Sequence, residues 1–195
     1  MKESLKMILV LTLICGMFSI TLASLKQATQ SRIEEQVLTY VQGPAINRVL
    51  NEYDNSPVKD RKKFTVPGTG KKVTVFPAIK NGKISGVALE TFAKGFGGEV
   101  GVMVGFNINE DSLSGIGITT MKETPGVGSK VAGHGFTSQF KKHSTTLELS
   151  SKGGNIDGVT GATISSTASV EAVKKAVSIF KTLRPQIVKV WAKGL

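Results

Sequence analysis

The sequence is poor in the residues that most often build metal sites. It has one cysteine, Cys15, and two histidines among 195 residues. A single cysteine excludes a disulfide within the chain, and we expect neither a zinc site nor an iron–sulfur cluster held by this chain alone. We therefore predict no metal ligands. Aromatic residues make up only 6% of the chain while glycine occurs 22 times, which is typical of folds rich in turns and strands.

Acidic residues are also scarce. The chain has 14 Asp and Glu against 25 Lys and Arg, for a formal net charge of +11. The basic residues form short clusters, such as 61–63 and 141–142, rather than one arm or stripe. This distribution argues against a nucleic-acid reader, and we predict no nucleic-acid partner. It fits a solvated surface, or attraction to anionic lipid, an acidic partner protein or a phosphate-bearing ligand.

An uncharged apolar run occupies residues 7–25. As a helix it would be about 28 Å long, enough to cross the core of a bilayer. A cleaved signal peptide is the alternative, because Lys2 and Lys6 form a basic start and residues 21–23 are a tolerable cleavage site. The run is longer than a usual signal core, so we predict a retained transmembrane anchor over 1–25. The positive-inside rule then favours a single-pass protein of the cytoplasmic membrane with its domain on the extracytoplasmic side.

The rest of the chain predicts a juxtamembrane helix and linker over 26–72 and one α+β domain with a mainly antiparallel sheet over 73–195. In the linker we expect Gly43-Pro44 to break or bend the helix and residues 55–72 to form a loop. In the domain we expect Arg184-Pro185 to end the last helix. The other patterns indicate strands at 73–79, 84–92, 100–108 and 113–121, turns at Asn81-Gly82 and 109–112, a loop at 123–135, a short helix within 136–143, an amphipathic helix over 165–183 and an apolar segment at 187–191.

The most informative segment is D-G-V-T-G-A-T-I-S-S, residues 157–166, directly before the amphipathic helix. A helix start offers backbone N–H groups without intrahelical partners and the positive end of the helix dipole, so it suits a phosphate. Gly161 and Ala162 would permit close approach of the backbone. By itself, however, a stretch rich in Ser and Thr before a helix is also an ordinary helix cap.

The same segment resembles a known motif. Asp157, the tetrad Thr160-Gly161-Ala162-Thr163 and the hydroxyl of Ser165 are similar to the flavinylation motif of FMN-binding domains in the G subunit of the Rnf complex and in the C subunit of sodium-pumping NADH:quinone reductase. The resemblance implies that FMN is joined by a phosphoester to Thr163, with the other three residues of the tetrad and Ser165 around the phosphate. It implies further that a separate flavin transferase, using FAD, recognises Asp157.

A second segment, Glu123-Thr124-Pro125-Gly126-Val127-Gly128, resembles the E-T-P-G-L-G loop that lies near the flavin ring in this family, with valine in place of leucine. Without the resemblance it would be read as a type II turn only. Rigid backbone at Pro125-Gly126 and the Thr124 hydroxyl suit contact with a polar ring edge. Glu123 belongs to the same loop, and Lys130 is a further candidate, as a cation that would stabilise the reduced, anionic flavin.

The resemblance implies a role inside a complex rather than that of a free enzyme. We expect an electron-relay subunit of a membrane-bound, ion-translocating ferredoxin:NAD oxidoreductase, the Rnf complex, with no independent turnover. Its partners would be the other membrane and peripheral subunits, the flavin transferase during maturation, and the membrane. The short chain favours the G subunit of the Rnf complex over a protein like the C subunit of the quinone reductase. A membrane-tethered basic binding module without flavin is the alternative from another class.

Overall fold

The computed structural model describes residues 2–110 and 112–192. Position 111 of the predicted turn, residue 1 of the predicted anchor and residues 193–195 of the predicted domain lie outside this part. The chain divides into two compact units, Met1–Tyr40 and Val41–Leu195. Each unit is described by itself below.

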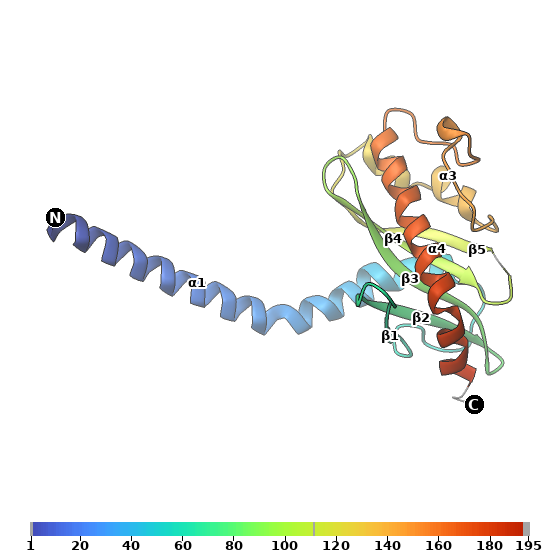
Figure 1. The fold of residues 1–195 in the computed structure, drawn as a ribbon, viewed down its shortest axis with the longest axis horizontal. Coiled ribbons are helices and arrows are strands. Elements are labelled where there is room, and N and C mark those ends of the chain that lie inside the picture. Colours follow the sequence, from blue (N-terminus) through green and yellow to red (C-terminus); the bar gives the residue numbers. More distant parts are fainter. Residues whose placement is uncertain (1, 111, 193–195) are drawn as a thin grey trace. The chain divides into compact units, whose positions relative to one another are not determined.

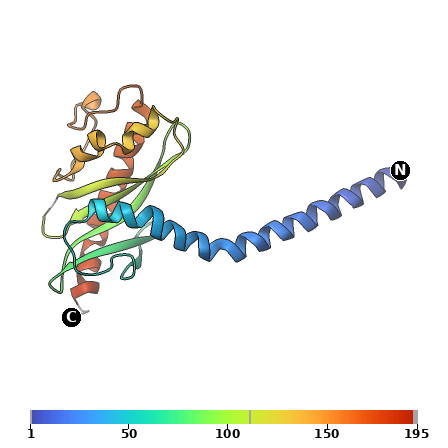
Figure 2. The same ribbon diagram turned by 180° about the vertical axis from the view of Figure 1, so that it is seen from behind.

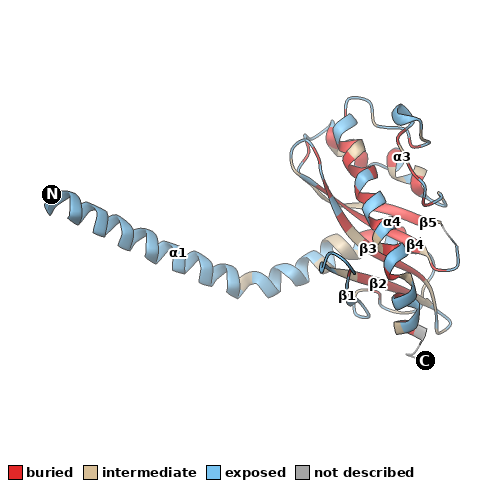
Figure 3. Cartoon of the chain, in the orientation of Figure 1, coloured by how far each residue is buried: buried red, intermediate tan, exposed pale blue. Residues whose placement is uncertain are grey.

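The first unit is formed by helix α1, Lys2–Gln36, which buries none of its residues (Figure 3). It contains the whole apolar run over 7–25. Two threonine hydroxyls within that run donate to carbonyls one turn earlier, Thr12 to Ile8 at 2.8 Å and Thr21 to Met17 at 2.9 Å. Such internal bonds lower the cost of placing a hydroxyl in lipid. By length and composition, the helical stretch Lys2–Val49 is sufficient to cross a membrane.

The chain stays helical through Gly43 and Pro44, where the sequence suggests a break or a bend. A π-helical segment, Val37–Gln42, leads directly into α2, Gly43–Val49. Pro44 lies in the first turn of α2, directly after the π-helical segment. Helix α2 then buries Ala45, Ile46 and Val49, so this end of the helical stretch belongs to the core of the second unit.

The second unit is built on an antiparallel five-stranded sheet with the strand order β1-β2-β3-β4-β5. Its strands are β1 (Lys62–Thr65), β2 (Lys72–Lys80), β3 (Lys83–Lys94), β4 (Glu99–Asn107) and β5 (Leu113–Met121). The α+β class and the antiparallel sheet are thus confirmed. The structure corrects the expected loop over 55–72, because residues 62–65 of that range form strand β1. Only Phe64 of this short edge strand is buried, so its sequence shows no alternation of apolar and polar residues.

The sheet is ordered by short local connections. Asn81 and Gly82 have φ angles of 50° and 73°, as a two-residue turn of the predicted hairpin requires. Strand β4 pairs continuously with β3, from Gly86↔Asn107 to Lys94↔Glu99. The β3–β4 connection is therefore a tight turn at residues 95–98, in which the Gly95 N–H donates to the Gly98 carbonyl at 2.7 Å.

Two helices cover the two faces of the sheet. Helix α4, Thr163–Ala192, lies across one face (Figure 1), where it contacts β3 and β4. Helix α2 lies on the opposite face (Figure 2), where it contacts β4 and β5. Phe180 of α4 stacks on Phe106 of β4 with ring centroids 4.3 Å apart. Buried side chains of the segment between β5 and α4, including Val131, Phe136 and Phe140, also belong to the core.

Helix α4 continues through Pro185, so the predicted end at Arg184-Pro185 is wrong. Proline inside a helix costs about 3 kcal/mol. The last turns nevertheless bury Ile187 and Trp191, and Trp191 packs against Phe64 of β1 with centroids 5.5 Å apart. Each such side chain contributes about 1.5–3 kcal/mol on burial, which offsets the proline. The apolar segment expected at 187–191 is therefore the last part of this helix.

Short helical turns connect β5 to α4. They are η2 (Gly128–Ala132), α3 (His134–Thr137), η3 (Ser138–Phe140) and η4 (Ser150–Lys152). The short helix expected within 136–143 is thus present but begins earlier. Phe136 and Phe140 are buried and pack edge to face with centroids 5.3 Å apart. Both α3 and η3 contact β5, so this packing holds the segment against that strand.

Candidate functional site

The loop before α4 is held at both ends by side chains. At one end, Gln139 brackets the backbone of Asp157: its Nε2 donates to the Asp157 carbonyl at 3.1 Å and its Oε1 accepts from the Asp157 N–H at 2.7 Å. At the other, the Val159 N–H donates to Ser166 Oγ at 2.9 Å. Gly161 has φ of 79°, a value that glycine adopts without strain. The loop therefore enters the helix in one defined conformation.

Thr163 is the first residue of α4 and is exposed, while Ala162 before it is buried. The N–H of Ser166 donates to the Ala162 carbonyl at 2.9 Å, which begins the helical bonding. The N–H groups of the first turn, over 163–165, precede this bond and have no partner within the helix. They create a local positive potential beside the Thr163 hydroxyl, as a phosphate group would require.

The second predicted loop forms the turn expected from its sequence. The Val127 N–H donates to the Thr124 carbonyl at 3.3 Å, and Gly126 between them has φ of 77°. Ser129 Oγ accepts from the Gly126 N–H at 2.8 Å and closes the turn. Pro125 and Gly126 are exposed at its tip.

The two loops meet at one cleft of about 380 Å³. From the loop at α4 it is lined by Gly161, Ala162, Thr163, Ile164 and Ser165, from the loop after β5 by Glu123, Thr124, Val127 and Gly128, and from the β3–β4 turn by Phe96. Six of the predicted site residues are therefore brought together. Thr160, Pro125 and Gly126 are absent from this lining, although they belong to the same two loops.

Glu123 is the side chain that ties these segments together. It is buried, and its Oε2 accepts from the Ser165 hydroxyl at 2.6 Å. Its Oε1 accepts from the Gly97 N–H at 3.2 Å. One carboxylate thus joins the loop after β5, the first turn of α4 and the β3–β4 turn. We infer a positioning role from this geometry, because both oxygens of Glu123 are already engaged within the protein.

Gly128 leaves the space in which the Glu123–Ser165 bond forms. A Cβ at position 128 would lie 2.7 Å from Glu123 Cβ and 2.9 Å from Ser165 Oγ, closer than unbonded atoms pack. Position 128 therefore requires glycine because the Glu123 and Ser165 side chains approach its backbone closely. This requirement is distinct from the requirement for a positive φ at Gly161.

Lys130 and Asp157 lie at a second, open hollow of about 530 Å³, together with Phe136 and Gln139. The Asp157 carboxylate accepts from Ser150 Oγ at 2.8 Å, and the residue is exposed. Neither Lys130 nor Asp157 is among the residues that line the cleft. The predicted roles of these two residues, beside the flavin ring and in recognition by a transferase, stay predictions.

The sequence interpretation missed three apolar residues of the cleft: Phe96, Val127 and Ile164. Val127 and Ile164 stand inside the quoted motifs but carry no polar chemistry. Phe96 had one available signal, a lone aromatic residue in the glycine turn 95–98. Its distance in sequence from both motifs concealed the connection.

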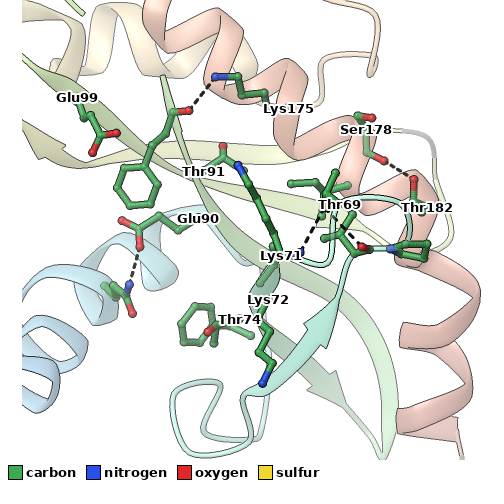
Figure 4. Close-up of a pocket in the computed structure, with 17 residues that line it drawn as sticks. Thr69, Lys71, Lys72, Thr74, Glu90, Thr91, Glu99, Lys175, Ser178 and Thr182 are labelled. Atoms are coloured by element: carbon green, nitrogen blue, oxygen red, sulfur yellow. Dashed lines mark hydrogen bonds between the residues drawn. The ribbon is translucent and has the colours of Figure 1, made fainter. Parts of the chain in front are cut away.

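A larger hollow of about 860 Å³ lies elsewhere on the unit, where β2 and β3 diverge. Their pairing ends at Val75↔Leu89 although β3 continues to Lys94. Figure 4 shows Lys71, Lys72 and Lys175 at this hollow together with Glu90 and Glu99. None of the predicted site residues lines it, and its mixed charges do not favour an anion.

The cleft combines a polar end with apolar walls. The polar end is the start of α4 with the exposed Thr163, and the walls include Phe96, Val127 and Ile164. Its volume lies within the range of ligand pockets, about 300–1,000 Å³. This arrangement suits a flat, largely apolar ligand that carries one anionic group. Among the described residues, no group of three or more His, Cys, Asp and Glu could hold a metal ion.

Comparison with known proteins agrees with this geometry. Residues 95–178, which include both loops and the β3–β4 turn, match the family described as FMN-binding domain. The chain is 31% identical over 187 residues to the G subunit of the ion-translocating oxidoreductase complex of Escherichia coli O157:H7, covering 88% of each protein. It is 29% identical over 196 residues to the protein of the same name from Aliivibrio fischeri strain MJ11, covering 90% of this chain and 91% of that one.

A solved structure gives the fold. The crystal structure of Shewanella oneidensis NqrC superposes with a TM-score of 0.53 at 19% identity, covering 74% of this chain and 73% of that one. At this identity the likeness concerns the fold alone.

Proposed function

The chain belongs to the family of G subunits of ion-translocating oxidoreductase complexes, and from this premise we propose that it relays electrons within such a complex, the Rnf complex, through FMN bound covalently to Thr163. The observation that carries the proposal is the cleft, because it places the exposed Thr163 hydroxyl at the start of α4 and opposite the second loop. When bound, FMN supplies reversible electron transfer. We expect turnover only within the complex, because the chain would act as one of its subunits.

The residues that line the cleft are of the chemical types that would bind the phosphate and the ring of FMN. The N–H groups over 163–165 would face the phosphate, and Gly161 and Ala162 would let the backbone approach it. Thr124 at the opposite wall would offer its hydroxyl to the ring. Glu123 would hold the two walls at a fixed separation through Ser165. The chain thereby binds and orients the flavin, while hydrogen bonds and burial tune its potential.

Attachment to Thr163 would exchange one phosphate bond for another. The Thr163 Oγ forms a bond to the phosphorus on the FMN side of FAD, the bond from that phosphorus to the AMP oxygen breaks, and AMP leaves. The hydroxyl proton passes to a base of the flavin transferase or to water. An unaided threonine hydroxyl is a poor nucleophile, so the transferase is required as a partner. The exposed Asp157, held by Ser150 and Gln139, would be recognised by that enzyme.

Membrane anchoring is the second part of the proposal. Helix α1 would cross the cytoplasmic membrane once, with its amino terminus inside and the second unit on the extracytoplasmic side. The other membrane and peripheral subunits of the complex would be its partners. Digestion by a protease added to intact spheroplasts tests the orientation. Digestion only after the cytoplasmic face is opened would overturn it.

The decisive experiment is denaturing gel electrophoresis of the full chain co-produced with a flavin transferase, followed by flavin fluorescence and peptide mass analysis. We expect flavin on the peptide that contains Thr163. The Thr163→Val variant removes the hydroxyl with little change of shape and should lose the label completely. Thr167→Ala, one turn further along α4, is the matched control and should keep it.

Two results would contradict the proposal. One is a wild-type chain that loses all flavin on denaturation, which would favour a binding module without covalent flavin. The other is flavin found on a residue other than Thr163 in the peptide map.

A further inference from the structure

Three exposed apolar side chains surround the cleft, and they come from three separate segments. Phe96 of the β3–β4 turn is 71% exposed, Ile164 of α4 is 52% exposed and Val127 of the loop after β5 is 43% exposed. Single exposed apolar residues are ordinary on protein surfaces, but three gathered at one cleft indicate a ligand-binding surface. We call Phe96, Val127 and Ile164 the apolar rim.

The position of Phe96 is fixed relative to Thr163 by hydrogen bonds. The turn that carries Phe96 is joined to Glu123 through the Gly97 N–H, and Glu123 is joined to the first turn of α4 through Ser165. The Phe96 ring itself takes part in none of the aromatic contacts found among the described residues. The backbone beside Phe96 is therefore anchored, while its ring lacks an aromatic partner among the described residues.

We propose that the isoalloxazine ring of FMN stacks against Phe96, with Val127 and Ile164 completing its apolar seat. This inference rests on the proposed attachment of FMN at Thr163. An aromatic pair in offset or edge-to-face contact is more favourable than burial of area alone. A ring tethered only through its phosphate would otherwise rotate freely, which electron transfer at fixed distance does not tolerate. Phe96 is thus a positioning residue for the ring, and it does not contribute to the covalent bond.

Tryptophan substitution gives a direct spectroscopic test in the full chain with flavin loaded. An indole in contact with excited flavin quenches its fluorescence by donating an electron. We expect Phe96→Trp to lower the flavin fluorescence yield severalfold. Phe92→Trp is the matched control, because Phe92 is also exposed and lies on β3 but lines the other hollow. We expect this variant to retain the wild-type yield.

Removal of the Phe96 ring tests the same contact without a quencher. Phe96→Ala should leave flavin loading on Thr163 unchanged in the peptide map while lowering the fluorescence anisotropy of the flavin, because the ring gains rotational freedom. Phe96→Tyr should restore the wild-type anisotropy. Since Phe96 is exposed, these variants do not disturb the core.

The outcomes separate the two proposals. A loaded Phe96→Trp variant with the same fluorescence yield as Phe92→Trp, or a loaded Phe96→Ala variant with unchanged anisotropy, would overturn the stacking inference alone. Absence of flavin from Thr163 in the wild-type chain would overturn the proposed function and this inference with it.

Discussion

Removal of the Glu123 carboxylate should be among the most damaging single changes at the cleft. In Glu123→Ala the Ser165 hydroxyl and the Gly97 N–H both lose their acceptor. A hydrogen bond to a charged group contributes about 1.5–3 kcal/mol, with short buried bonds at the upper end. The bond from Ser165 is 2.6 Å long and buried, whereas the bond from Gly97 is 3.2 Å long and partly buried. We therefore expect a loss of about 4–5 kcal/mol in the free energy of unfolding.

Two further variants divide this loss between its causes. Glu123→Gln keeps an acceptor for Gly97 and can donate to Ser165, so it replaces charged bonds by neutral ones and should cost about 1–2 kcal/mol. Ser165→Ala removes the shorter bond only and should cost about 3 kcal/mol. The double variant Glu123→Ala/Ser165→Ala should cost less than the sum of the two single variants, because they share this bond.

The assay is denaturant unfolding of the full chain in detergent, followed by the fluorescence of Trp191. This residue is the only tryptophan in the chain and is buried at the end of α4, so its signal reports on packing of α4 against the sheet. A Glu123→Ala variant within about 1 kcal/mol of the wild type would refute the reasoning. Strict additivity in the double variant would also refute it.

Three other changes follow from the packing of the second unit. Gly128→Ala should lower the free energy of unfolding by about 1–3 kcal/mol, since its Cβ would press on the Glu123–Ser165 bond; a neutral effect in denaturant unfolding would contradict this. Pro185→Ala should raise the free energy of unfolding by up to about 3 kcal/mol because it removes the cost of proline inside the helix, and a decrease in the melting temperature would count against it. A hydrogen bond from Lys174 holds the pKa of Glu148 below its ordinary value of 4.5. This pair therefore stabilises the fold above pH 4.5, and its contribution is lost as the pH falls through the lowered pKa of Glu148. Lys174→Met should remove this acid-dependent part of the stability, which unfolding at a series of pH values would detect.

Much of the domain could be predicted from local sequence. Strand β5 occupies the predicted range, and the hairpin at Asn81-Gly82 has the expected conformation. These elements are readable because alternation of apolar residues and turn-forming pairs act over a few neighbouring positions. The start of α4 near Thr163 was readable for the same reason, since a helix start is marked by hydroxyls and small residues, whereas the link to FMN came from the resemblance to a known motif.

The errors lie where distant contacts outweigh local preference. Pro185 ordinarily ends a helix, but burial of Ile187 and Trp191 against the sheet keeps α4 intact. Strand β1 carries only one buried residue, Phe64, whose ring packs against Trp191 at the end of α4. In both cases the deciding partner is far away in the sequence.

The sequence by itself determined the apolar helix, four of the five strands and the motif around Thr163, because each is written in a continuous run of residues. Only the tertiary structure decided what surrounds Thr163. It brought Phe96 to the cleft, turned Glu123 inward as the link between Gly97 and Ser165, and placed Lys130 and Asp157 at a different hollow. Strand register and helix packing set these neighbours, and both depend on contacts between segments that no local pattern connects.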